Sequence, residues 1–162
     1  MSRGMAAAIG AMALLVASCS GGDVAERIIE GQEGVGDVEV NEDDGSVKIE
    51  IEDEEGDISA SFGAGEIPDG FPIDVPNGGS VMAVVEQSDD ATVSLSYNSS
   101  EFDSIVGFYE DWIAGTGSEV VNKLEVANPK SVAWTVEDGD SRYSISVSDT
   151  GSEIFVNLFV DR

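Results

Sequence analysis

Acidic side chains are the most abundant groups in this sequence that could do chemistry. The chain contains 33 Asp and Glu residues, and short acidic clusters lie at 41–45, 52–56 and 137–140. Carboxylate oxygens are the preferred ligands of Ca²⁺. Two carboxylates about 5 to 9.5 Å apart can also hydrolyse a glycosidic bond. Calcium binding and carboxylate catalysis are therefore the two chemistries to test first against the sequence.

Neither calcium binding nor carboxylate catalysis is supported by a specific sequence motif. If Gly45 is the glycine of an EF-hand loop, Val40 falls at the first ligand position, where Asp or Asn is required. The cluster at 137–140 is typical of a hairpin turn, and no particular pair stands out among 33 carboxylates. We therefore predict a solvated acidic surface, with no metal site and no cofactor. Binding of divalent cations or small ligands by the acidic segment remains the alternative hypothesis.

Other catalytic side chains are missing or lack the expected spacing. The chain has no histidine, which excludes a His-dependent triad and histidine metal ligands. Its serines occur in no GxSxG or SxxK motif. Trp112 and Trp134 could stack on a sugar or peptide, but both lie on apolar faces and are expected in the core. We predict no catalytic residues and no enzymatic activity.

The charge of the chain limits its partners. Only 7 Lys and Arg residues oppose the acidic groups, which gives a net charge of -26. Such a chain repels phosphate backbones and anionic lipid head groups, so we expect no nucleic-acid partner. Salt-adapted surfaces have the same composition, because high ionic strength screens self-repulsion. Any attachment to a membrane has to be covalent or inserted.

The first 19 residues predict such an attachment. Arg3 precedes an apolar stretch at 5–17, which is too short for a stable membrane span and is followed by small residues and the single cysteine, Cys19. The sequence Val16-Ala17-Ser18-Cys19 resembles the lipobox of bacterial lipoproteins. The resemblance implies a signal peptide at 1–18, a diacylglyceryl group on Cys19, and anchoring in the bilayer of the cell envelope. Ser20, where Asp marks inner-membrane retention, implies an outer-membrane lipoprotein facing the periplasm.

The rest of the chain divides into three parts by composition. Residues 19–64 form an acidic N-terminal segment, in which a short helix at 23–29 and a glycine-rich tether at 31–36 are possible. Apolar residues then recur at every second position around 38–40, 47–51 and 58–62, which predicts a three-strand meander with turns at 41–45 and 52–56. Whether residues 36–62 pack on the main domain remains open from the sequence.

Residues 65–79 contain Pro68, Pro72 and Pro76, which predict an extended strap with Phe71, Ile73 and Val75 packed on the domain. Its IPxxFPxDVP pattern resembles a segment of uncharacterised bacterial lipoproteins that precedes a small α+β domain. The resemblance implies a fold and an envelope location but no activity.

Residues 80–162 form the main predicted domain. Alternating patterns predict strands at 80–87, 91–98, 118–126, 131–137, 141–148 and 152–161. A stripe of apolar residues from Phe102 to Ile113, capped by Ser100, predicts one amphipathic helix that Gly115 and Gly117 end. The order ββαββββ favours an α+β fold, with an antiparallel sheet and one packed helix.

Two predicted strands, 81–85 and 154–160, are apolar on both faces and need cover on both. The helix covers one face, and the other needs the meander, the strap or a partner. These observations favour a membrane-anchored, non-catalytic envelope lipoprotein that binds another envelope protein or supports an assembly.

Overall fold

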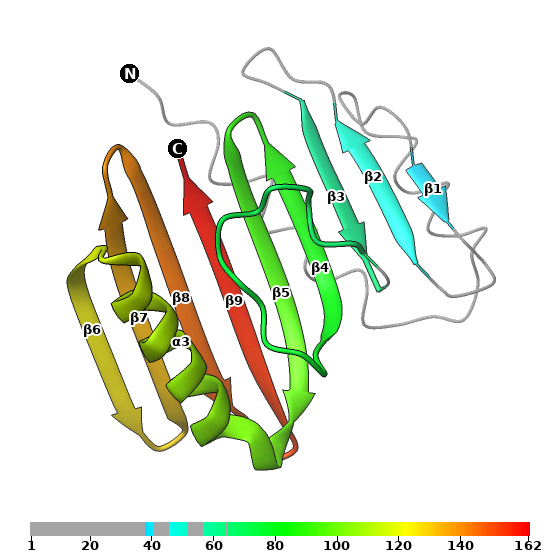
Figure 1. The fold of residues 1–162 in the computed structure, drawn as a ribbon. Helices are drawn as coiled ribbons and strands as arrows, with labels where there is room; N and C mark the ends of the chain where they lie inside the picture. The colour runs from blue at the N-terminus through cyan, green and yellow to red at the C-terminus, as the bar shows by residue number, and fades with distance from the viewer. Residues whose placement is uncertain (1–37, 41–45, 52–56, 64) are drawn as a thin grey trace, which may run out of the picture.

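The computed structural model describes residues 38–40, 46–51, 57–63 and 65–162. These residues form one antiparallel sheet with the strand order β1-β2-β3-β4-β5-β9-β8-β7-β6 (Figure 1). The strands are β1 (Val38–Val40), β2 (Val47–Ile51), β3 (Ile58–Phe62), β4 (Ser80–Gln87), β5 (Asp90–Asn98), β6 (Glu119–Ala127), β7 (Lys130–Asp138), β8 (Ser141–Asp149) and β9 (Glu153–Asp161). The predicted α+β class and the ββαββββ order of the main domain are confirmed. No helix in the described ranges is long and apolar enough to cross a membrane.

Three strands N-terminal to the strap continue the sheet of the main domain. β1, β2 and β3 pair in sequence, and β3 pairs with β4 over five residues from Ile58 to Phe62. The meander predicted from the alternating residues therefore extends the sheet edgewise. The predicted helix at 23–29, the tether and the turns at 41–45 and 52–56 lie outside the described residues.

One α-helix, α3 (Phe102–Thr116), follows a 3-10 turn, η2 (Ser99–Glu101). Its buried side chains Phe102, Ile105, Tyr109 and Ile113 recur at helical spacing, as predicted. The prediction of Ser100 as the N-cap is wrong, because η2 intervenes. The Glu101 carboxylate instead accepts a hydrogen bond from the backbone N–H of Asn98 at 3.2 Å. Gly117, with φ of 73°, ends the helix in the left-handed conformation as predicted, whereas Gly115, also predicted to end it, lies within α3.

The core lies between α3 and one face of the sheet, which we call the helix face. Val84, Val93, Leu158, Ile145 and Trp134 are in register across β4, β5, β9, β8 and β7, and each is less than 5% exposed. Trp134 therefore lies in the core, as predicted. Trp112 is half-buried and packs edge-on against Tyr143, with the ring centroids 6.0 Å apart.

The proline-rich strap, residues 65–79, crosses the helix face over β4 and β5 (Figure 1). Ile73 is 2% exposed, and Phe71 and Val75 pack against the same core, as predicted. The Tyr97 hydroxyl on β5 donates a hydrogen bond to the Pro76 carbonyl at 2.9 Å. The strap thus covers the helix face over β4 and β5, beside α3.

On β5 and β7–β9, the opposite face of the sheet, the open face, carries mainly small polar side chains, whereas on β2 and β3 the same face carries apolar ones, with Ile49 6% and Ala60 9% exposed. Register assigns to it Thr92, Ser94, Ser96, Ala133, Thr135, Ser144, Ser146 and Ser148, together with Phe155, Asn157 and Phe159 of β9. Within the described ranges the strap lies on the helix face and the meander lies in the sheet, so neither element covers the open face.

Replacement of Gly107 by Ala in α3 is expected to raise the free energy of unfolding by about 0.5–1 kcal/mol. Alanine has less conformational freedom than glycine in the unfolded chain, so less entropy is lost when the helix forms. A Cβ at Gly107 meets no atom within 4 Å. Urea denaturation measures the change. Gly117→Ala is the matched control, and its φ of 73° predicts a loss of stability. If both variants lost stability, the helical environment assigned to Gly107 would be wrong.

Tyr109→Phe is also expected to stabilise the fold, by about 1 kcal/mol. Tyr109 is 0% exposed, and its hydroxyl is the buried side-chain polar atom within the described ranges for which no hydrogen-bond partner is found. Removing this hydroxyl removes a desolvation cost and leaves the ring packed against Phe108. A Tyr97→Phe variant is the matched control, because it removes a hydroxyl that has a partner, and it should lose stability.

Because of the same two tyrosines, we expect the folded protein to lose stability at alkaline pH. Burial raises the pKa of Tyr97 to about 12 and raises the pKa of Tyr109 further, whereas an unfolded tyrosine ionises near pH 10. Above pH 10 the unfolded chain therefore loses protons that the folded chain retains, and its ionisation favours unfolding. Each tyrosine lowers the free energy of unfolding by at most about 1.4 kcal/mol per pH unit. Urea titrations at pH 8–11 should show a shallower decline for Tyr109→Phe than for the wild type.

Candidate protein-binding edge of the sheet

Strand β6 forms one edge of the sheet, beyond β7 (Figure 1). All nine of its residues are exposed, unlike those of any other described strand. Four of the six exposed large hydrophobic side chains in the described ranges lie on it, namely Val120, Val121, Leu124 and Val126. Unpaired N–H and C=O groups on an edge strand can pair with a strand from another molecule.

The pairing of β6 with β7 is regular over most of its length. The register shifts between Val120 and Asn122, so Val121 is an extra residue at a β-bulge. From Asn122 to Ala127 every residue has a partner on β7. A β-bulge or a lysine on an edge strand hinders its pairing with strands of other molecules. Here the bulge disturbs only the first part of β6 and leaves six consecutive residues in regular geometry.

Lys123 is held on the helix face of β6. Its Nζ lies 2.9 Å from a carboxylate oxygen of Glu110 on α3 and 2.7 Å from one of Glu125. It also lies 5.8 Å from the centroid of the Trp134 ring, within the range of a cation–π contact. Hydrogen bonds to Glu125 and Glu110 raise the pKa of Lys123 above its usual 10.5. The ammonium group is therefore charged at neutral pH and turned toward α3.

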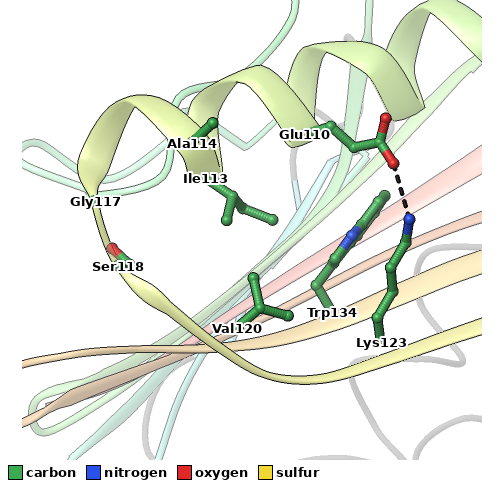
Figure 2. Close-up of a pocket in the computed structure, with 8 residues that line it drawn as sticks. All are labelled: Glu110, Ile113, Ala114, Gly117, Ser118, Val120, Lys123 and Trp134. Carbon is green, nitrogen blue, oxygen red and sulfur yellow. Dashed lines mark hydrogen bonds and ion pairs between the residues drawn. The ribbon is translucent and has the colours of Figure 1, made fainter.

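A groove lies between the C-terminal half of α3 and the start of β6 (Figure 2). Its volume is about 460 Å³, and it is shallow and open to solvent. Side chains of Ile113, Val120 and Trp134 give it an apolar floor, and the Glu110–Lys123 ion pair closes one end. Val120 belongs both to the groove and to the exposed apolar residues of β6. We call the combination of β6 and this groove the edge site.

The edge site is acidic at its rim. Glu110 and Glu125 pair with Lys123, which is the single basic side chain of β6, and Glu119 lies at the start of the strand. Across the described ranges, Lys48, Lys123, Lys130 and Arg142 are all engaged in ion pairs with carboxylates. The negative field of the chain is therefore not offset at this edge. A partner that approaches β6 gains from positive charge.

Some of the functional residues and turns predicted from the sequence lie in the described part of the chain, and others do not. Cys19, the predicted lipidation site, lies outside the described residues, as does the cluster at 41–45. The hairpin turn predicted at 137–140 is confirmed, because β7 ends at Asp138 and β8 begins at Ser141. Over the described part of the chain, no group of three or more His, Cys, Asp or Glu side chains could hold a metal ion.

No family model, curated protein or solved structure matches the chain. The resemblance to bacterial lipoproteins therefore rests on the sequence motifs alone. A function has to be proposed from the residues and their geometry.

Sequence reasoning predicted β6 as a strand but did not single out the edge site. Val120, Val121, Leu124 and Val126 break strict alternation, and Lys123 and Glu125 interrupt them. This irregular mixture of apolar and charged residues is the sequence feature that could have indicated an exposed strand, because a covered strand shows either regular alternation or an apolar run. The groove gave no signal, because it joins Ile113 on α3 to Trp134 on β7 and depends on tertiary packing.

Proposed function

We propose that this protein is a membrane-anchored bacterial envelope lipoprotein that binds another envelope protein and has no catalytic role of its own. The anchor is Cys19, in the lipobox Val16-Ala17-Ser18-Cys19. The observation that carries the binding role is the exposure of β6, where apolar side chains and a regular strand edge occur together. Large exposed apolar patches on soluble domains mark interaction sites.

The charge of the chain supports both parts of this proposal. At -26, the chain is repelled by the anionic surface of a bilayer, so a lipid anchor supplies an attachment that the protein surface does not. Two or three acyl chains hold a protein far more firmly than one. The same charge keeps the exposed apolar residues of β6 from causing non-specific association. The edge site then remains available to a partner of complementary charge.

Two measurements on the native protein test the proposal. Mass spectrometry of the mature chain should find Cys19 as the first residue, carrying a diacylglyceryl group. Chemical cross-linking in intact cells, followed by purification under denaturing conditions, should recover a stoichiometric protein partner. An unmodified chain that begins elsewhere would exclude the lipoprotein assignment. A chain that remains uncross-linked at native abundance would exclude the binding role.

A further inference from the structure

We propose that residues 122–127 of β6 bind an extended, basic segment of a partner protein, which extends the sheet by one strand. This inference rests on the proposed function and names the surface and the chemistry of the partner. Its first ground is the backbone. The segment is regular, lies at the sheet edge and is six residues long, which is a common length for a strand. Strand addition uses such an edge, with backbone hydrogen bonds for affinity and alternate side chains for specificity.

The two faces of β6 set the pattern of the incoming strand. Leu124 and Val126 are in register with Ala133 and Ser131, so they lie on the open face. Lys123 and Glu125 are in register with Trp134 and Val132 on the helix face. Directly opposed residues of paired strands share a face. The partner therefore presents apolar side chains beside Leu124 and Val126, and alternates them with side chains that meet the charged residues of the helix face.

The charge on the helix face favours basic side chains. Glu125 and Glu110 both hold Lys123, so two carboxylates share one ammonium group. Glu119, in register with Glu137, adds negative charge at the start of β6 on the open face. A lysine or arginine opposite Glu125 restores the balance, and opposite charges across paired strands stabilise the pairing. An apolar side chain nearer Val120 can lie over the groove beside Ile113 (Figure 2).

A second copy of the chain fits this surface less well. Self-pairing through β6 would bring together two chains that each carry -26 charges. It would also place two acidic rims side by side, and the pairing of one six-residue edge buries little area against that repulsion. A basic segment of another protein meets the same backbone with complementary charge.

Binding of synthetic peptides to the full chain in detergent tests this inference. The probe is a blocked octapeptide in which valine and lysine alternate, labelled for fluorescence anisotropy. A peptide of the same composition, with four lysines before four valines, controls for diffuse charge attraction. We expect the alternating peptide to bind at least about ten-fold more tightly, and hydrogen exchange to slow at the amides of 122–127. Equal binding of the two peptides, or protection confined to other strands, would overturn the inference.

Two variants of the edge and one control locate the contact. Leu124→Lys and Val126→Lys each place a positive charge beside the incoming strand, and we expect at least a ten-fold loss of affinity. Met82→Lys changes the charge equally at another exposed apolar residue, 44% exposed on β4, and should bind as the wild type does. Circular dichroism verifies that each variant is folded. Unchanged affinity in both β6 variants would contradict the proposed edge.

The outcomes separate this inference from the proposed function. If cross-linking in cells recovers a partner but the alternating peptide shows no preference for β6, the inference fails and the binding role stands. If no partner is recovered in cells, the binding role fails whatever the peptide does. If cross-linking recovers a species of twice the chain mass, the occupant is a second copy, and the basic partner is excluded.

Discussion

Leu158→Ala is expected to lower the free energy of unfolding by about 3–5 kcal/mol. Leu158 is 0% exposed on β9, at the centre of the sheet, and is in register with Val93 of β5 and Ile145 of β8. Both neighbours are fixed by the paired strands, so they cannot move to fill the cavity. Domains of this size are stable by about 5–15 kcal/mol, so the variant loses a large part of its stability. Urea denaturation followed by tryptophan fluorescence measures the change.

Phe159→Ala is the matched control for Leu158, because it shortens the next side chain of the same strand. Phe159 points to the open face and is 37% exposed, so its truncation should cost only about 1 kcal/mol. A cost for Phe159 equal to that for Leu158 would mean that the open face is covered as fully as the helix face. The assignment of core and open faces would then be wrong.

Replacement of Cys19 by Ala is expected to release the protein from the membrane or to leave it unprocessed. The thiol is the acceptor of the lipid in the lipobox pattern, and alanine offers no equivalent group. We expect nearly all of the wild type in the membrane fraction, and the variant shifted in mass and no longer acylated. Fractionation and mass spectrometry of the two proteins measure the difference. Ser18→Ala is the control, because alanine is also small and should allow acylation.

A Cys19→Ala protein that stays in the membrane at its wild-type level, with an unchanged mass, would show that the anchor lies elsewhere. The result would leave the edge site untouched, because β6 and Cys19 carry separate parts of the proposed function.

Much of the fold follows from local patterns in the sequence. The alternation of Val93, Leu95 and Tyr97 predicts β5, and these residues are 0%, 1% and 4% exposed on one face. The apolar stripe from Phe102 to Ile113 predicts α3, because 3.6-residue periodicity is a local property of the chain. Gly117 likewise ends the helix as predicted, because glycine readily adopts a positive φ.

The strand order and the edge site depend on contacts that sequence patterns do not encode. β5 pairs with β9 across 54 or more intervening residues, and this pairing leaves β6 at the edge. The periodicity of β6 gives no preference for an edge over a central position. The Lys123 contacts with Glu110 and Trp134 join a helix to two strands, so they form only when all three elements have packed.

The open face also illustrates this limit. From Val156 and Leu158 alone, β9 is clearly buried on one side, and Phe155 and Phe159 then suggest cover on the other. The sequence leaves the meander, the strap and a partner as equal candidates for that cover. Pairing of β3 with β4 and the Tyr97–Pro76 hydrogen bond place the first two elsewhere.

Site-specific photo-cross-linking in cells that produce the full chain tests most directly whether β6 binds an envelope partner. A photoreactive side chain is placed in turn at Leu124 on the edge, at Phe159 on the open face and at Met82 on β4, which are all exposed positions. We predict a strong cross-link to a single partner from position 124 and little from positions 159 and 82. A partner captured from position 159, with none from position 124, would contradict the edge site and move the interaction to the open face.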